Sequence, residues 1–133
     1  QHGLIVYSSS WYNLPLDAGV MGQFSADEHR FGIHAGDMET SMMLALSPAS
    51  VNMAEAKNFA STSQDRAKHY AVLGNGKSAK LGWHMQDYNP QGAAGNAAAA
   101  TAAKGEALVH SAGEQLALLL KELVALPLTT VRV

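Results

Sequence analysis

The chain has 133 residues, the size of a single domain. Hydrophobic residues make up 47% and charged residues 15%, so the chain can bury a core and is not a self-repelling disordered polymer. A net charge of -2 gives no cationic surface for phosphates or anionic lipids, so no nucleic-acid partner is expected. The absence of cysteine excludes disulfides and thiolate metal sites and fits the cytoplasmic location that we expect. No apolar run approaches the ~20 residues that span a bilayer, so we expect no membrane partner.

The first predicted element is a strand over residues 3–7. This run is apolar and β-branched, as is typical of strands covered on both faces of a parallel sheet. The polar and aromatic residues 8–13 follow it, where a parallel strand would end over a ligand crevice. Trp11 is therefore a candidate for ligand contact, although a solvated loop with a half-buried tryptophan fits the same composition. Residues 13–32 lack a sustained period and predict a long loop of the kind that can act as a lid.

The remaining elements are mostly helical. Apolar spacing predicts a helix from residue 34 to residue 46, ending before Pro48. The later expectations are a short helical turn over 54–59, an edge strand or hairpin arm over 81–85, a long amphipathic helix over 98–126 and a β-prone tail over 128–133. Residues 83–88, rich in aromatic and polar side chains, could line a cleft or a subunit interface.

The densest polar cluster lies at the start of the helix predicted over 34–46. His34 and Asp37 are three residues apart and so share one helix face. An imidazole and a carboxylate placed together can bind a divalent metal or transfer protons. The polar residues of this cluster could equally cap the helix and complement its dipole, and spacing alone leaves both interpretations open.

Residues 34–46 read His-Ala-Gly-Asp-Met-Glu-Thr-Ser-Met-Met-Leu-Ala-Leu. They resemble the His-[Ala/Gly]-Gly-x-x-Glu-Thr-Ser-x-Met-Leu segment of the creatininase (creatinine amidohydrolase) family. Ser9-Ser10-Trp11, the Pro48 turn and Ala-Thr-Ala-Ala-Lys-Gly at 100–105 are also similar to family segments. The family's N-terminal Glu-x-x-Gly-x-His-Leu-Pro and Asn-Gly-His segments, which supply most metal ligands, have no counterpart here. Residues 1–133 are therefore expected to be the C-terminal half of a single creatininase-like domain.

The resemblance implies a three-layer α/β/α fold around a mostly parallel sheet, of which only the C-terminal half is present. It also implies a divalent metal, zinc or manganese, and hydrolysis of a non-peptide or cyclic C–N amide bond in a small molecule. Family members commonly form homo-oligomers, often hexamers. The chain alone is expected to be inactive. The alternative is a non-catalytic assembly or binding module that keeps the fold without the metal site.

Four residues take roles from the resemblance. His34 matches the histidine that carries a proton to the leaving nitrogen, and Trp11 matches the aromatic residue of the substrate flap. Glu39 matches an acidic position of the motif, with a catalytic or a supporting role. Asp37 occupies a position that is acidic in many creatininase-like proteins, and we hypothesise that it is a metal ligand.

Two positions depart from the creatininases proper. Ile33 and Arg30 stand where those enzymes have a glutamate and a tryptophan. These departures point away from creatinine itself as the substrate.

Overall fold

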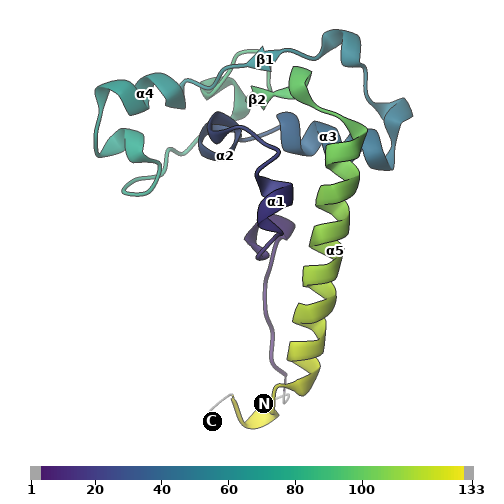
Figure 1. Cartoon of the computed structure of the whole chain (residues 1–133). Helices are drawn as coiled ribbons and strands as arrows, with labels where there is room; N and C mark the ends of the chain where they lie inside the picture. Colours follow the sequence, from purple (N-terminus) through teal and green to yellow (C-terminus); the bar gives the residue numbers. More distant parts are fainter. Residues whose placement is uncertain (1–3, 131–133) are drawn as a thin grey trace.

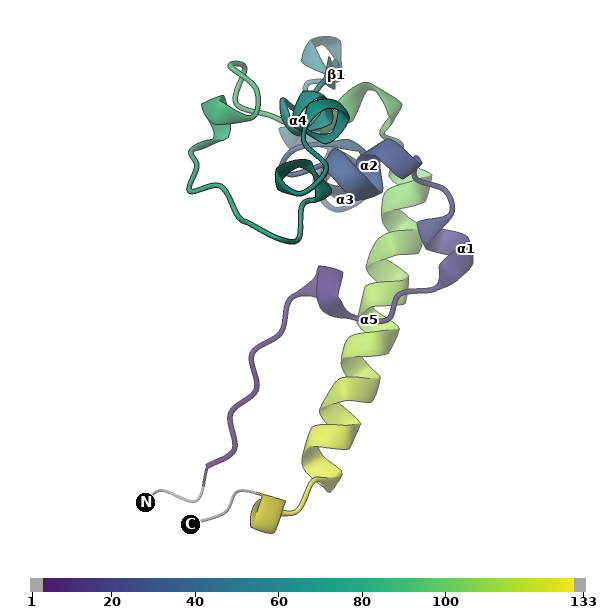
Figure 2. The ribbon, with the colours of Figure 1, turned by 90° about the vertical axis from the view of Figure 1, so that its left-hand side faces the viewer.

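The computed structural model describes residues 4–130, which form two regions. We call residues 11–111 the head, and residues 4–10 together with 112–130 the stem. The stem comprises the N-terminal segment and the second half of the long helix α5 (Ala102–Ala125). Both leave the head in the same direction (Figures 1 and 2).

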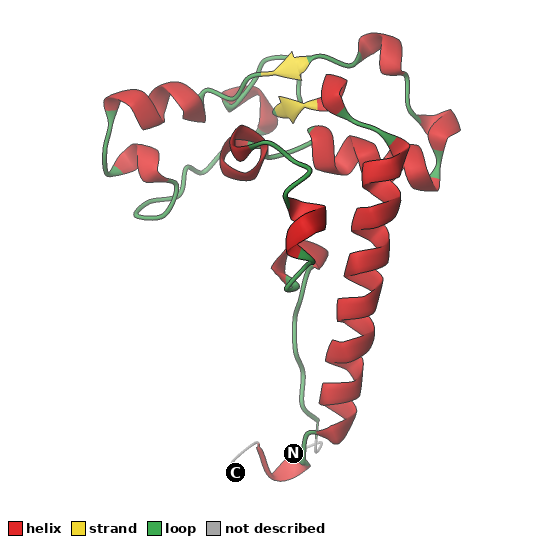
Figure 3. Ribbon diagram, in the orientation of Figure 1, coloured by secondary structure: helices red, strands yellow, loops and turns green. Residues whose placement is uncertain are grey.

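Helices dominate both regions (Figure 3). The α-helices that precede α5 are α1 (Ala18–Met21), α2 (Ala26–Phe31), α3 (Asp37–Leu46) and α4 (Ser63–His69). Short 3-10 helices span Trp11–Asn13, Pro48–Ser50, Met53–Glu55, Leu73–Asn75, Met85–Asp87, Ala97–Ala99 and Leu128–Thr130. Strands β1 (Asn58–Phe59) and β2 (Gly95–Asn96) form a two-stranded antiparallel sheet, in which Asn58 lies opposite Asn96.

The core of the head lies where α3 packs against the first half of α5. Gly105, Leu108 and Ser111 are buried along one face of α5 at intervals of three residues. A Cβ atom at Gly105 would collide with the carbonyl oxygen of Ser41, so the two backbones approach closely because residue 105 is glycine. Thr101 caps α5 by accepting a hydrogen bond from the Lys104 N–H (3.3 Å).

The two helices with clear apolar periodicity are confirmed. The predicted helix over 34–46 begins at Asp37, because Gly36 is its extended N-cap, and it ends at Leu46 before Pro48. The predicted helix over 98–126 begins at Ala102, after the Thr101 cap. Caps rather than periodicity set both starting points.

The prediction of a long loop over residues 13–32 is wrong, because α1 and α2 occupy it. Each begins at a side-chain cap: Asp17 accepts from the Val20 N–H (2.9 Å), and Ser25 accepts from the Glu28 N–H (3.0 Å). These helices have four and six residues. They are too short to show an apolar period, so only their caps mark them in the sequence.

Both predicted strands outside the small sheet are wrong. Residues 4–7 form no strand, and Leu4 and Val6 are 72% and 85% exposed, while Gly3 lies outside the described residues. Residues 81–85 form no strand either. A buried strand needs flanking strands for its hydrogen bonds, and residues 4–130 place none beside these segments. The described residues therefore contain a small antiparallel sheet and not a three-layer α/β/α arrangement around a parallel sheet.

The other local expectations are met only in part. The helical turn expected over 54–59 is a 3-10 turn, Met53–Glu55, followed by β1, and the polar stretch beyond it forms α4. The β-prone tail is a 3-10 turn at Leu128–Thr130, and residues 131–133 lie outside the described residues. None of the helices within residues 4–130 combines the length and apolar character needed to cross a membrane.

Candidate functional site

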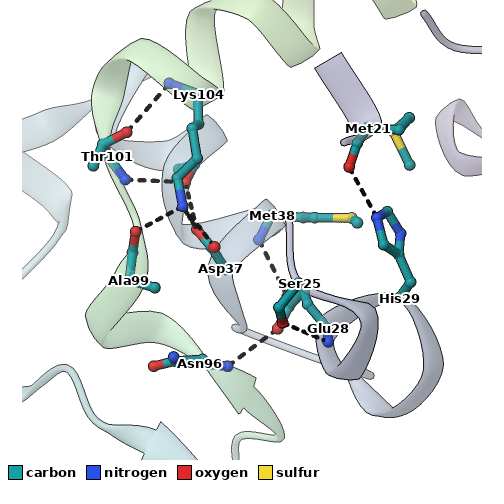
Figure 4. A network of polar contacts seen from close by, with 11 residues as sticks. Met21, Ser25, Glu28, His29, Asp37, Met38, Asn96, Ala99, Thr101 and Lys104 are labelled. Carbon is teal, nitrogen blue, oxygen red and sulfur yellow. Dashed lines mark hydrogen bonds and ion pairs between the residues drawn. The ribbon is translucent and has the colours of Figure 1, made fainter. Parts of the chain in front are cut away.

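Glu28 in α2 organises the loop that leads into α3 (Figure 4). Its buried carboxylate accepts hydrogen bonds from the Met38 N–H (3.2 Å) and the Asn96 N–H (3.1 Å). It thereby joins α2, the first turn of α3 and β2, and it satisfies a backbone donor at a helix N-terminus. A Cβ atom at Gly36 or Gly95 would collide with this carboxylate or with the neighbouring backbone. The two glycines therefore make room for Glu28.

The backbone that carries His34 is fixed from both sides. The Ala94 N–H donates to the His34 carbonyl (2.8 Å), and the His34 N–H donates to the Ala94 carbonyl (3.2 Å). Ala35 has φ 53°, the left-handed region that alanine rarely adopts. Its N–H donates to Glu39 Oε2 (2.7 Å) and its carbonyl accepts from Thr40 Oγ1 (3.3 Å). These bonds hold a tight turn that presents the His34 side chain.

His34 and Glu39 interact directly. The Nδ1 atom of His34 lies 3.2 Å from Glu39 Oε2, the oxygen that also accepts the Ala35 N–H. The two side chains are 58% and 42% exposed. Because Nδ1 faces a carboxylate, Nε2 is the ring nitrogen left to meet another molecule.

A cavity of about 420 Å³ is lined by Trp11, His34 and Glu39. This volume lies within the range of small-molecule sites, which are roughly 300–1,000 Å³. Trp11 belongs to a 3-10 turn and packs edge-to-face against Tyr12, with ring centroids 5.8 Å apart. The structure thus brings together three of the four residues singled out in the sequence, and their chemical roles stay predictions.

Asp37, the fourth residue, lies outside that cavity. Both of its carboxylate oxygens are 2.6 Å from Lys104 Nζ, and Oδ1 also accepts from Ser41 Oγ (3.1 Å) (Figure 4). Lys104 Nζ donates further to the Ala99 carbonyl (2.7 Å) and lies over the Phe24 ring. Asp37 therefore forms a buried ion pair between α3 and α5.

Within residues 4–130, no three histidine, aspartate or glutamate side chains gather as a group that could hold a metal ion. The carboxylate of Asp37 is already bound to an ammonium group, which a cation would have to displace. The described residues by themselves do not fit a zinc or manganese site. The role of Asp37 as a metal ligand stays a prediction, without support from this geometry.

Sequence reasoning missed Glu28, whose carboxylate fixes the loop before α3, and Lys104, whose ammonium group joins α5 to α3. Glu28 fell inside the expected loop over 13–32. The spacing Ser25-x-x-Glu28 is that of a helix N-terminal capping box and could have indicated α2. Lys104 lies in the segment 100–105 that resembles the family, but nothing in the sequence tells which carboxylate this lysine will meet.

The family model for creatininase, described as creatinine amidohydrolase, matches residues 5–120. The chain belongs to the creatininase family. The resemblance drawn from residues 34–46 is thereby confirmed.

A solved structure from Bacteroides fragilis NCTC 9343, assigned as a creatinine amidohydrolase, matches this creatininase-family chain with a TM-score of 0.63 and 33% sequence identity. The match covers 86% of this chain and 41% of that protein, so the chain spans less than half the length of its structural neighbour. A comparison with curated protein sequences gives no match.

Proposed function

We propose that the chain provides the proton-transferring part of a creatininase-type amidohydrolase that opens a cyclic or other non-peptide C–N amide bond. The observation that carries this proposal is the placing of His34, Glu39 and Trp11 on one cavity, with His34 Nδ1 3.2 Å from Glu39 Oε2. Membership of the creatininase family supports a hydrolase. The cavity volume of about 420 Å³ suits a small molecule rather than a polypeptide.

His34 would act through Nε2, because Glu39 holds Nδ1. Amide hydrolysis adds water to the carbonyl carbon, breaks the C–N bond and leaves its electron pair on nitrogen. That nitrogen must gain a proton, and imidazole gives one up readily near neutral pH. Glu39 would keep the ring oriented, as the acidic partner of a catalytic histidine does. The products are a carboxylate and an amine.

Trp11 would cover the substrate. A planar ring beside the cavity can stack on a planar amide and exclude water from the reaction. Figure 2 places its 3-10 turn between the extended segment 4–10 and α1, and therefore on a connection rather than in the core. Such a position suits a residue that moves aside when substrate enters.

The zinc or manganese ligands would come from a further segment, because the described residues do not form a metal site. The chain covers 41% of its structural neighbour, and the stem carries apolar side chains such as Leu120 (53% exposed) and Val124 (89% exposed). We propose that a segment equivalent to the uncovered part of the neighbour packs on the stem and completes the site. Assembly into homo-oligomers, hexamers by resemblance, belongs to the same proposal.

Complementation tests this function. The chain is mixed with the segment of the Bacteroides fragilis neighbour that it does not cover, and with zinc or manganese. Association is measured by native mass spectrometry. A panel of lactams and cyclic ureas is then assayed for the addition of one water molecule. We expect hydrolysis only in the complex.

Point variants assign the chemistry. His34→Asn should reduce kcat by roughly 100-fold or more, the usual contribution of a general acid. Glu39→Gln should reduce it less than Glu39→Ala, because the amide still accepts the Ala35 N–H. The control is His110→Asn, an exposed histidine of α5. A complex that forms without activity, or a His34→Asn variant as active as the control, would overturn the proposal.

One observation favours a second function. The ion pair between Asp37 and Lys104 neutralises a carboxylate that could otherwise bind a metal. A non-catalytic binding module would keep this ion pair and the cavity, and it would bind the same small amides without hydrolysing them. Binding of a lactam to the metal-free complex, with no turnover after metal addition, would distinguish this module from the enzyme.

A further inference from the structure

A second cavity, of about 510 Å³, lies between α2, α4 and the chain that follows α4. This chain makes a wide loop beyond α4 (Figure 2). We call the cavity the basic pocket, because Arg30, Arg66 and Lys80 line it and no aspartate or glutamate does. These are three of the nine lysines and arginines of a chain whose net charge is -2. Their gathering in one cavity is therefore a local feature and not a consequence of overall charge.

The three cations have no carboxylate partner in the part of the chain that the structure describes. Within the described residues 4–130, none of them forms an ion pair. The acidic residues next to the pocket in sequence, Asp65 and Asp87, are paired with Lys68 and His84 instead. The charged groups that line the basic pocket are therefore all positive.

Aromatic rings and a hydroxyl group hold the two arginines in place. The Arg30 guanidinium lies over the Phe31 ring, 4.8 Å from its centroid, and the Arg66 guanidinium lies 5.2 Å from the Tyr88 centroid. Arg66 also donates to Thr62 Oγ1 (3.0 Å). A guanidinium has five N–H donors, so most donors of Arg66 remain free for a ligand. An arginine that is already oriented loses little entropy when it binds an anion.

The rest of the wall is flat and apolar. Trp83 and Tyr88 pack edge-to-face with ring centroids 5.2 Å apart, and both line the basic pocket. Trp83 is 50% exposed and Leu81 is 47% exposed, so these side chains have free surface that a ring could cover. Residues 83–88 were interpreted as the lining of a cleft or of a subunit interface, and two of them, Trp83 and Tyr88, line this pocket.

We propose that the basic pocket binds a small molecule that joins a phosphate or carboxylate group to a flat ring. The anionic group would meet Arg30, Arg66 and Lys80, since guanidinium groups bind both anions through paired N–H donors. The ring would cover Trp83. Ile33 lines both this pocket and the cavity of His34, but no pocket cation lines that cavity. The binding therefore does not depend on amide hydrolysis.

Tryptophan fluorescence tests this site in the whole chain. The chain has two tryptophans, so the Trp11→Phe variant leaves Trp83 as the only one. Phenyl phosphate and benzoate should change its fluorescence saturably, and phenol should not. Inorganic phosphate should bind at least tenfold more weakly than phenyl phosphate. Its binding is measured by its competition with phenyl phosphate. Comparison of phenyl phosphate with benzoate decides which anion the pocket prefers.

Charge variants provide the matched comparison. In the Trp11→Phe background, Arg66→Gln should weaken phenyl phosphate binding about tenfold or more, because a charge-assisted bond is lost. Lys80→Gln should weaken it severalfold, and Arg66→Lys should fall between Arg66→Gln and the parent. The control is Lys68→Gln, on the same helix but outside the pocket and paired with Asp65.

The helical circular dichroism signal establishes that each variant is folded. Equal binding of phenol and phenyl phosphate would overturn the role of the cations. So would equal affinity of the Arg66→Gln and Lys68→Gln variants. Equal affinity for inorganic phosphate and phenyl phosphate would overturn the role of the ring.

Discussion

The helix α5 passes through both regions of the molecule, and its two halves differ sharply. In the head, Gly105, Leu108 and Ser111 are buried against α3 and the segment before α1. In the stem, no residue of the second half is buried, and Val124 is 89% exposed. Figure 1 shows the second half of the helix running clear of the head.

Both halves contain alanine, glutamate and lysine, and the second half has five leucines against one in the first. High helix propensity maintains the helix through both halves, since each of these residues loses little free energy there. The burial of a residue in α5 depends instead on the elements that pack against that part of the helix. The head supplies α3 and a set of polar bonds, whereas the stem meets only a few residues of the described chain. Helix formation is therefore a property of the sequence of α5, and burial is a property of its neighbours.

Breaking the ion pair between Asp37 and Lys104 should disturb the head most. Asp37→Asn removes the negative charge and leaves the Lys104 ammonium, whose side chain is 15% exposed, without its carboxylate. We expect the free energy of unfolding to fall by about 3–5 kcal/mol, as for other broken buried pairs. Urea unfolding monitored by circular dichroism measures it.

The control for this variant is Asp65→Asn, which breaks the exposed pair with Lys68. That change should cost at most about 1 kcal/mol, because exposed pairs contribute little. Equal effects of the two variants would mean that the head does not depend on the pair. A double variant, Asp37→Leu with Lys104→Met, should recover part of the loss, since it removes both charges together.

A single substitution made in each half of α5 compares the two regions directly. Gly105→Ala places a Cβ atom against the Ser41 carbonyl, so α3 and α5 must separate. We expect a loss of about 1–3 kcal/mol. Gly113→Ala meets nothing within 4 Å and should stabilise the helix by up to about 1 kcal/mol. Thermal unfolding of both variants shows whether each substitution raises or lowers the stability. Two losses of stability of similar size would show that the second half of α5 is also packed.

The elements that the sequence predicted well are those whose signal is local. The helices over 34–46 and 98–126 carry apolar periodicity. The prediction that His34 and Asp37 share one helix face is wrong, because His34 precedes α3 and meets Glu39, whereas Asp37 meets Lys104. The cavity could not be predicted from local spacing, because Trp11 lines it from a segment that is distant in the sequence. Only the family resemblance connected Trp11 with His34. These predictions rested on apolar spacing and on the resemblance to the creatininase family, and both signals were strongest around residue 34.

The failures have a common physical cause. A strand over residues 3–7 was predicted from composition, but a strand is stable only with neighbouring strands, and the described residues supply none. The contact of Asp37 was not predicted either. The family resemblance implied a metal ligand, a role that stays a prediction, and its carboxylate binds Lys104, 67 residues away. Long-range partners of this kind leave no mark in local spacing.

The smallest effect is expected in the stem. Val124→Ser replaces an apolar side chain that is 89% exposed, so the free energy of unfolding of the chain alone should change by no more than about 0.5 kcal/mol. The same variant should weaken association with the complementary segment of the Bacteroides fragilis neighbour, because the proposed function places that segment over the stem. Urea unfolding of the chain and titration calorimetry of the mixture separate the two effects.

A change confined to unfolding would place Val124 in a packed core. Unchanged association would remove the stem from the surface that the segment covers, and the exposed side chains of Leu116, Leu118, Leu120 and Val124 would then require a different partner.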